Sequence, residues 1–177
     1  KIDSKIFNKS INRITMVACG TSSYACKVAR FWFEKLAGIP VHIDIASEYR
    51  YRNIIHTDNE LVLFISQSGE TRDTIACLEE VKKTGVKTFS VVNVSESSIA
   101  RLSDETILTL AGPEIGVAST KAFIGQMIVL YLLILKISKE RKDIKEDEYL
   151  KLVLDLKKLP EFIEQTLNKQ KDIQIIA

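Results

Sequence analysis

Cysteine is scarce in this sequence, and the positions of the few cysteines exclude two classes of protein. Cys19, Cys26 and Cys77 have neither the paired spacing of zinc ligands nor the density of a secreted disulfide scaffold. We therefore expect reduced thiols, no metal site and a cytoplasmic protein.

An excess of charge of one sign is also missing. The 25 basic and 23 acidic residues give a formal net charge of +2, and both signs are spread along the chain. Nucleic acids and anionic membranes attract proteins with a concentrated positive surface, which this pattern does not predict. We expect no nucleic-acid partner and a ligand that is recognised locally.

Long hydrophobic runs are absent as well. The most apolar stretch, Ala122–Ile137, is interrupted by Gly125, Gln126 and Lys136 and is shorter than the roughly 20 residues of a membrane span. It predicts a buried helix and no membrane partner. Residues 1–10 lack the pattern of a signal peptide, and the apolar last residues have no helix stop signal, so we expect a piece of a longer protein.

What the sequence does contain is a regular alternation of two patterns. Short β-branched runs alternate with helical stretches from Arg13 to about Ile137, which indicates a parallel sheet with helical crossovers. Most runs are continuously apolar, as in strands that are covered on both faces. The fold class predicted is α/β, a sandwich with a five-stranded parallel sheet whose strands lie at residues 13–19, 41–45, 60–65, 86–92 and 105–110.

Two helical stretches have a clear inward face and a clear end. The first carries an apolar stripe that includes Trp32 and ends at Gly38, which makes Trp32 a packing residue. The second runs from about Glu70 to Thr84 and is followed by Gly85, a typical helix cap.

The last part of the sequence differs from the rest in composition. Residues 138–147 are strongly charged, and two helical segments follow, the second with Pro160 in its first turn. We divide the chain into a domain of residues 1–140 and a helical linker or tail of residues 141–177.

Three loops that follow predicted strands are small, rich in hydroxyl groups and contain glycine. They are "CGTSS" (19–23), "SQSGET" (66–71) and "GPEIGVASTK" (112–121). Ligands of parallel α/β sheets bind outside the carboxyl ends of the strands, and each loop leads into a helix whose free N–H groups attract anions. Ordinary helix capping is the alternative for any one loop. A nucleotide site is excluded, because there is no GxGxxG and "GVASTK" lacks the glycine before lysine of a Walker loop.

Four motifs together resemble a known family. "ACGTSSYA", "IASEYRYR", "SQSGETRDT" and "GPEIGVASTKAF", within roughly Ile11–Leu135, are similar to the first sugar isomerase (SIS) domain of the glutamine:fructose-6-phosphate amidotransferase family. The resemblance implies a flavodoxin-like three-layer sandwich within an enzyme that also has a glutaminase domain and a second SIS domain. That enzyme converts fructose-6-phosphate and glutamine to glucosamine-6-phosphate and glutamate.

The resemblance also implies a set of substrate-binding residues. It assigns the sugar pocket to Cys19, Gly20, Thr21 and Ser22, the phosphate to Ser66, Gln67, Ser68 and Thr71, and a loop that closes over the sugar to Val117, Ala118 and Ser119. The implied ligands are fructose-6-phosphate, glucose-6-phosphate and glucosamine-6-phosphate, without a cofactor. The segment Glu48–Arg52 is implied in a homodimer contact; a solvated charged face is the alternative.

No residue of this chain is predicted to be catalytic. The resemblance places the glutamate base, the Schiff-base lysine and the ring-opening histidine of the family in the second SIS domain and the C-terminal tail. From the residues themselves, His42 and His56 read as structural, Glu70 as a cap, and Glu114 as the better local candidate for a base. A regulatory sugar-phosphate sensor and a standalone sugar-phosphate isomerase are the alternative functions.

Overall fold

The computed structural model describes residue 7 and residues 10–116 and 119–176. The chain divides into two compact units, the first ending at Asp143 and the second beginning at Ile144. Each unit is described by itself.

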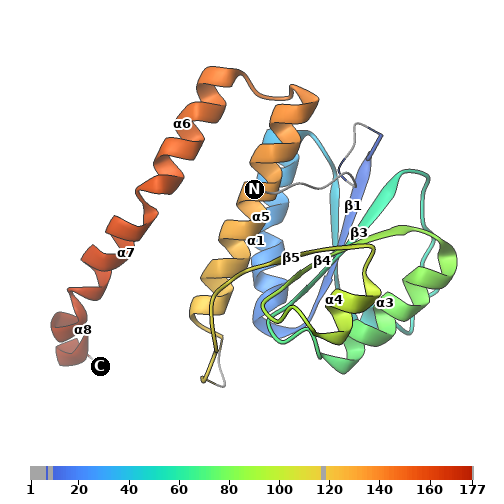
Figure 1. Cartoon of the computed structure of the whole chain (residues 1–177), viewed down its shortest axis with the longest axis horizontal. Helices are drawn as coiled ribbons and strands as arrows, with labels where there is room; N and C mark the ends of the chain where they lie inside the picture. Colours follow the sequence, from blue (N-terminus) through green and yellow to red (C-terminus); the bar gives the residue numbers. More distant parts are fainter. Residues whose placement is uncertain (1–6, 8–9, 117–118, 177) are drawn as a thin grey trace. The chain divides into compact units, whose positions relative to one another are not determined.

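The first unit is built on a five-stranded parallel sheet, which confirms the predicted α/β class (Figure 1). The strand order is β2-β1-β3-β4-β5, the flavodoxin-like order. The central strands β1 and β3 are almost completely buried, as their continuous apolar sequences predicted, whereas β5 at the edge is half-buried. The strands are β1 Arg13–Ala18, β2 Val41–Ile45, β3 Glu60–Ser66, β4 Lys87–Val92 and β5 Glu105–Leu108.

Helices cover both faces of the sheet and complete the three layers (Figure 1). The helices α1 (Gly20–Ala37) and α5 (Lys121–Arg141) pack against each other on one face. On the other face lie α2 (Ala46–Tyr49), α3 (Arg72–Thr84) and α4 (Ser98–Leu102). The Trp32 ring meets the Tyr131 ring edge to face at 4.9 Å between centroids, so Trp32 is a packing residue, as predicted.

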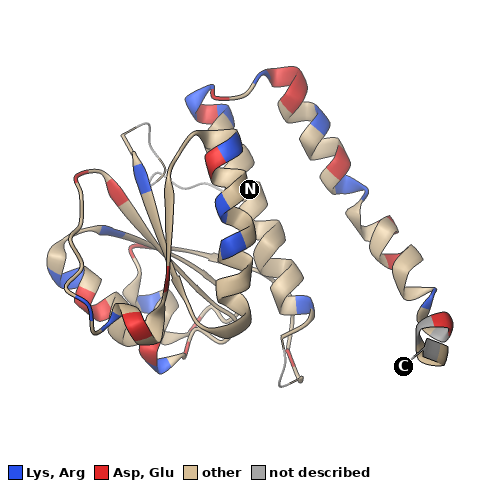
Figure 2. Cartoon of the chain, turned by 180° about the vertical axis from the view of Figure 1, so that it is seen from behind, with Lys and Arg blue, Asp and Glu red and all other residues tan. Residues whose placement is uncertain are grey.

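Helix α5 is longer than the apolar run that predicted it. Its 21 residues are enough, by length and composition alone, to cross a membrane, yet half of its most apolar window is buried inside the structure. A core helix of a globular domain has the same properties, because it is covered by protein on most sides. Lys and Arg alternate with Asp and Glu over the first unit, without a region of one sign in the view of Figure 2.

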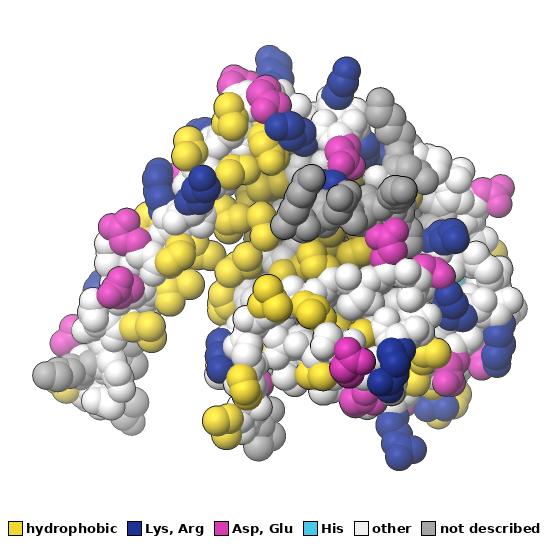
Figure 3. All heavy atoms as spheres, viewed as in Figure 1, with side chains coloured by type: hydrophobic (Ala, Val, Ile, Leu, Met, Phe, Trp, Pro, Cys, Tyr) yellow, Lys and Arg dark blue, Asp and Glu magenta, His cyan; other side chains and the backbone are white. Residues whose placement is uncertain are grey.

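The second unit consists of helices whose described side chains are mostly exposed. Its elements are α6 (Glu146–Lys157), α7 (Leu159–Leu167) and α8 (Gln170–Ile176). No described residue of α6 or α7 is buried, and Leu154, Phe162 and Leu167 are 56%, 54% and 65% exposed. Figure 3 shows hydrophobic side chains along these helices, which are amphipathic, and none of the described residues of α6 and α7 is buried by the rest of the chain.

Candidate functional site

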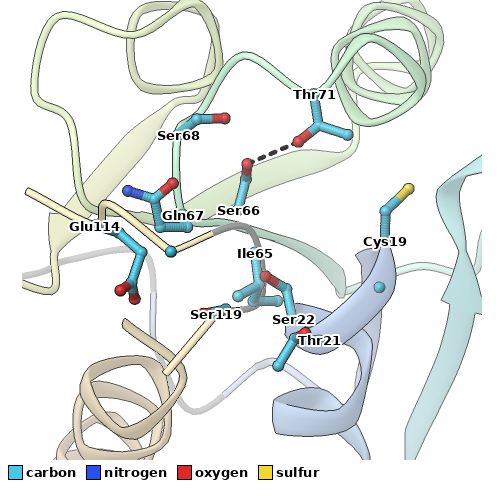
Figure 4. A pocket seen from close by; sticks show the side chains of 12 residues that line it. Cys19, Thr21, Ser22, Ile65, Ser66, Gln67, Ser68, Thr71, Glu114 and Ser119 are labelled. Atoms are coloured by element: carbon cyan, nitrogen blue, oxygen red, sulfur yellow. Dashed lines mark hydrogen bonds between the residues drawn. The ribbon is translucent and has the colours of Figure 1, made fainter. Parts of the chain in front are cut away.

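A cavity of about 330 Å³ opens at the carboxyl edge of the sheet, where β1 and β3 end side by side (Figure 4). The strand order reverses its direction between these two strands, which is where ligands of this architecture bind. The volume lies at the lower end of the range for small-molecule sites. The lining residues are Cys19, Gly20, Thr21, Ser22, Ile65, Ser66, Gln67, Ser68, Thr71, Glu114, Gly116 and Ser119.

The cavity brings together nine of the eleven residues that the resemblance assigned to substrate binding. They come from the start of α1, from the loop between β3 and α3, and from Ser119 before α5. Val117 and Ala118 lie outside the described residues. Ile65, Glu114 and Gly116 line the cavity in addition.

The start of α1 presents backbone N–H groups to the cavity. Cys19 is extended and Gly20 has a left-handed φ of 53°, so the chain turns sharply from β1 into the helix. The described first turn of α1 contains no acidic residue, and the Cys19 side chain makes no capping hydrogen bond. The positive end of the α1 dipole therefore lies at the cavity, and no acidic residue of the described first turn balances it.

The loop between β3 and α3 is folded by its own hydroxyl groups. The Ser66 hydroxyl oxygen accepts a hydrogen bond from the Gly69 N–H at 3.0 Å and lies 3.1 Å from the Thr71 hydroxyl (Figure 4). The Ser68 oxygen accepts from the Glu70 N–H at 3.1 Å. Each hydroxyl group can accept and donate at once, so the loop is closed while Ser68 and one member of the Ser66–Thr71 pair still have a hydrogen to donate.

Gly69 occupies a position in this loop that has no room for a side chain. Its φ is +67°, and a Cβ atom built on it would lie 2.1 Å from the Ser97 Oγ atom and 2.4 Å from the Ser97 Cβ atom. The Gly69 carbonyl oxygen also accepts from the Ile99 N–H at 3.1 Å. Glycine is required here because the loop turns through a left-handed conformation while it lies against the start of α4.

Asn93, after β4, ties two of the cavity loops together, and sequence reasoning missed it. Its Oδ1 atom accepts from the Thr109 hydroxyl at 2.9 Å and from the Ala111 N–H at 2.8 Å, and its Nδ2 donates to the Gly112 carbonyl at 2.7 Å. Its backbone N–H donates to the Gln67 carbonyl at 3.0 Å. Asn93 fixes where the loop after β5 begins.

Glu70 is a capping residue, but it caps α4 and not α3, the helix that follows it in the sequence. Its carboxylate accepts from the Ser98 N–H at 2.7 Å and from the Ser98 hydroxyl at 2.8 Å, at the start of α4. The bond from the Ser98 N–H, followed by that from the hydroxyl, lowers the pKa of Glu70. Helix α3 begins at Arg72, two residues later than predicted, with Thr71 as its N-cap.

Glu114, the local candidate for a base, occupies the start of α5. Its carboxylate accepts from the Ala122 N–H at 3.0 Å, the Thr120 N–H at 3.2 Å and the Thr120 hydroxyl at 3.2 Å. The bond from the Ala122 N–H is the largest cause that lowers the pKa of Glu114. A carboxylate whose ionised form is stabilised in this way is a poor base, so the geometry favours a capping role.

The other residues considered for catalysis lie elsewhere. His42 is in β2 beside Asp44, and the His56 Nδ1 atom lies 3.3 Å from Glu60 at the start of β3. Among the described lining residues, Cys19 and Glu114 are the ionisable ones, and neither lysine nor arginine is present. Within the described part of the chain no three His, Cys, Asp or Glu side chains gather into a metal-binding group.

Comparisons with known proteins agree on one family. A family model described as SIS domain matches residues 6–136. A glutamine–fructose-6-phosphate aminotransferase (isomerizing) from Bradyrhizobium diazoefficiens is 48% identical over 169 residues, covering 96% of this chain and 28% of that protein. The protein of the same description from Clostridium acetobutylicum is 44% identical with the same coverage.

A solved structure agrees with the sequence relatives. The C-terminal domain of glucosamine-fructose-6-phosphate aminotransferase from Francisella tularensis has a TM-score of 0.93 and 39% sequence identity, covering 97% of this chain and 49% of that chain. The chain spans 28% of the length of the curated relatives it matches.

Proposed function

This chain belongs to the SIS domain family, is homologous to the isomerase region of glutamine–fructose-6-phosphate aminotransferases, and on that basis we propose that its carboxyl-edge cavity binds fructose-6-phosphate. The phosphate lies against the loop of Ser66, Gln67, Ser68 and Thr71 before α3. The sugar lies toward Cys19, Gly20, Thr21 and Ser22, and Val117, Ala118 and Ser119 belong to the loop that closes over it.

The observation that carries this proposal is the state of the helix N-termini around the cavity. The first turns of α4 and α5 are occupied by the carboxylates of Glu70 and Glu114. In the described structure no acidic side chain bonds to the first N–H groups of α1 or α3, since Asp73 in the first turn of α3 pairs with Arg50 at 2.9 Å. An anion that enters the cavity therefore meets two unoccupied helix dipoles and several hydroxyl donors.

The proposed role in the whole enzyme is binding without turnover. Isomerisation needs a base near the proton that moves, and the described cavity offers only Cys19 and the capped Glu114 as ionisable groups. We assign the base, the Schiff-base lysine and the ring-opening histidine to the part of the enzyme beyond this chain. The full enzyme then forms glucosamine-6-phosphate and glutamate from fructose-6-phosphate and glutamine.

Three further assignments belong to the same proposal. The enzyme is a cytoplasmic homodimer whose isomerase domains meet, with Glu48–Arg52 at the contact. Residues 141–177 form a linker toward the second SIS domain, and the exposed apolar residues of α6 and α7, such as Leu154 and Phe162, support this because they need a covering surface.

Calorimetric titration of the chain tests the binding role. Fructose-6-phosphate, glucose-6-phosphate and glucosamine-6-phosphate should bind, and unphosphorylated fructose should bind at least about 100-fold more weakly because it lacks the dianion. Equal affinities for fructose and fructose-6-phosphate would refute a phosphate site. Rapid interconversion of fructose-6-phosphate and glucose-6-phosphate by the chain alone would refute the separation of binding from turnover.

A further inference from the structure

Gln126 is a buried polar residue that connects α5 to the cavity. It is 1% exposed, in the second turn of α5. Its Nε2 atom donates to the Ser22 hydroxyl oxygen at 3.0 Å, across 104 residues of sequence. Ser22 lines the cavity and is 9% exposed.

This hydrogen bond determines what the Ser22 hydroxyl can do. The Ser22 oxygen is used as an acceptor, so its hydrogen has to point elsewhere. No other hydrogen bond of the Ser22 hydroxyl exists among the described residues, whereas the neighbouring Ser23 donates to the Gly20 carbonyl at 2.7 Å. Because Ser22 lines the cavity and is otherwise largely buried, an acceptor in the cavity is the partner that remains for this hydrogen.

Two unpaired polar atoms lie in the same part of the molecule. The Gln126 Oε1 atom and the Ser119 Oγ atom are buried, and neither has a hydrogen-bond partner in the described structure. Buried polar groups are nearly always paired, because an unpaired one loses its hydration without compensation. A packing role alone would not require an amide at position 126, since an apolar side chain of similar size would avoid this cost.

Ser138 shows what a purely local polar residue on the same helix looks like. It is also completely buried, but its hydroxyl donates to the Ile134 carbonyl within α5 at 2.8 Å and is thereby satisfied. Gln126 instead reaches out of its own helix to a residue of the cavity. The difference indicates that the Gln126 side chain fixes the position of Ser22 and does not act to stabilise α5.

We infer that Gln126 is a positioning residue: it holds the Ser22 hydroxyl as a hydrogen-bond donor toward an oxygen of the bound sugar phosphate. This inference rests on the proposed function. It also gives α5, the helix that follows the closing loop, a direct connection to the ligand through α1.

Replacing the amide with a carboxylate tests the direction of this bond. In Gln126→Glu the ionised carboxylate accepts the Ser22 hydrogen and withdraws it from the ligand, so the affinity for fructose-6-phosphate should fall about 10-fold or more. A buried carboxyl group has a raised pKa, and its protonated form donates to Ser22 as the amide does. Between about pH 8 and about pH 5.5 the affinity of Gln126→Glu, taken as a ratio to the wild-type chain at each pH, should therefore recover.

The ratio to the wild-type chain removes the other titrations in this range. The ligand phosphate, whose second pKa is about 6, changes equally in both proteins. The described ionisable groups that line the cavity, Cys19 and Glu114, are common to both, and the lowered pKa of Glu114 keeps it ionised throughout. Gln126→Met, which keeps the volume, should bind a few-fold more weakly at every pH, and Ser138→Ala should bind as the wild type does.

Each result decides a separate point. No binding of fructose-6-phosphate to the wild-type chain would overturn the proposed function, and the inference with it. A wild-type chain that binds, together with a Gln126→Glu variant of equal affinity at all pH values, would overturn the inference alone. A loss in Gln126→Glu that does not recover at low pH would mean disturbed packing and would also overturn it; recovery within one protein sample shows that the variant is folded.

Discussion

A helix follows each of the five strands at the carboxyl edge of the sheet, and the starts of four of them, α1, α3, α4 and α5, fall into two pairs. The α4 and α5 starts are closed by carboxylates from neighbouring loops, Glu70 and Glu114. The α1 and α3 starts are surrounded by glycine and hydroxyl residues, and within the described residues no carboxylate bonds to their first N–H groups, because Asp73 in the first turn of α3 pairs with Arg50. The same backbone feature thus serves two purposes, and the side chains of the adjacent loops decide which.

The difference supports the proposal that a cavity without lysine or arginine among its described residues binds a dianion. A helix N-terminus carries about half a positive charge, which a carboxylate of the protein neutralises when it binds there. In the proposed site, two open starts and two closed starts direct an anion to one place. The closed starts contribute in a different way, because Glu70 and Glu114 fix the positions of the loops that frame the cavity.

The largest expected effect concerns the contact between Gly69, in the loop before the open start of α3, and Ser97, which precedes the closed start of α4. Gly69→Ala places a Cβ atom 2.1 Å from the Ser97 Oγ atom at a φ of +67°. Backbone strain and steric overlap together should lower the free energy of unfolding by about 2–6 kcal/mol. Urea denaturation followed by circular dichroism measures this change.

Gly85→Ala is the matched control for Gly69→Ala. Gly85 caps α3 with a φ of +78°, but nothing lies within 4 Å of the Cβ position. The strain alone should cost about 1–2 kcal/mol. If both variants lose the same stability, the contact between the loop before α3 and α4 is not what makes glycine necessary at position 69.

The second effect is on affinity at the open α3 start. Ser68→Ala or Thr71→Ala removes a hydroxyl group from the cavity and should weaken fructose-6-phosphate binding by about 1–3 kcal/mol, roughly 5- to 150-fold in titration calorimetry. Thr71→Ser keeps the hydroxyl group and should restore most of the affinity. Ser98→Ala removes a hydroxyl that bonds to Glu70 at the closed α4 start. An equal loss of affinity in Ser98→Ala would abolish the distinction between open and closed starts.

The third effect is on stability at the closed α5 start. Glu114→Gln removes the negative charge from the first N–H groups of α5, so the melting temperature at neutral pH should fall by a few degrees. The pKa of Glu114 is lowered in the folded chain, so its contribution is present above the ordinary pKa of a glutamate and is lost as the pH falls through the lowered value. The melting curves of variant and wild type should therefore converge in acid. A difference that stays constant with pH would mean that the charge is not the cause.

The grouping of the residues near the strand ends could be predicted from the sequence, because the carboxyl ends of parallel strands lie at the same edge of the sheet. All five strands lie within two residues of the predicted ranges, since burial on both faces requires continuous apolar runs. The loops after β1, β3 and β5 share one edge in any parallel sheet, so the nine described binding candidates line one cavity.

The connections between these loops could not be predicted from the sequence. Asn93 bonds to Thr109 and Ala111, and Gln126 bonds to Ser22 over 104 residues, so neither leaves a pattern in the local sequence. Glu114 is the local candidate for a base because it lies in the loop after the predicted fifth strand, but a carboxylate in a loop can equally cap a helix. Its three hydrogen bonds decide between these roles, and only the structure shows them.

The smallest expected effect is the response of fructose-6-phosphate affinity to salt. Salt screens charges that attract each other over a distance, but it weakens short hydrogen bonds in a recessed site much less. If the described cavity holds the dianion by N–H groups and hydroxyl groups, as proposed, the dissociation constant should rise less than about threefold between about 0.05 M and about 0.5 M salt. Potassium glutamate serves as the control for direct competition by chloride. A steep rise in both salts would show that lysine or arginine side chains from outside the described cavity carry much of the binding, and the open helix starts would then be secondary.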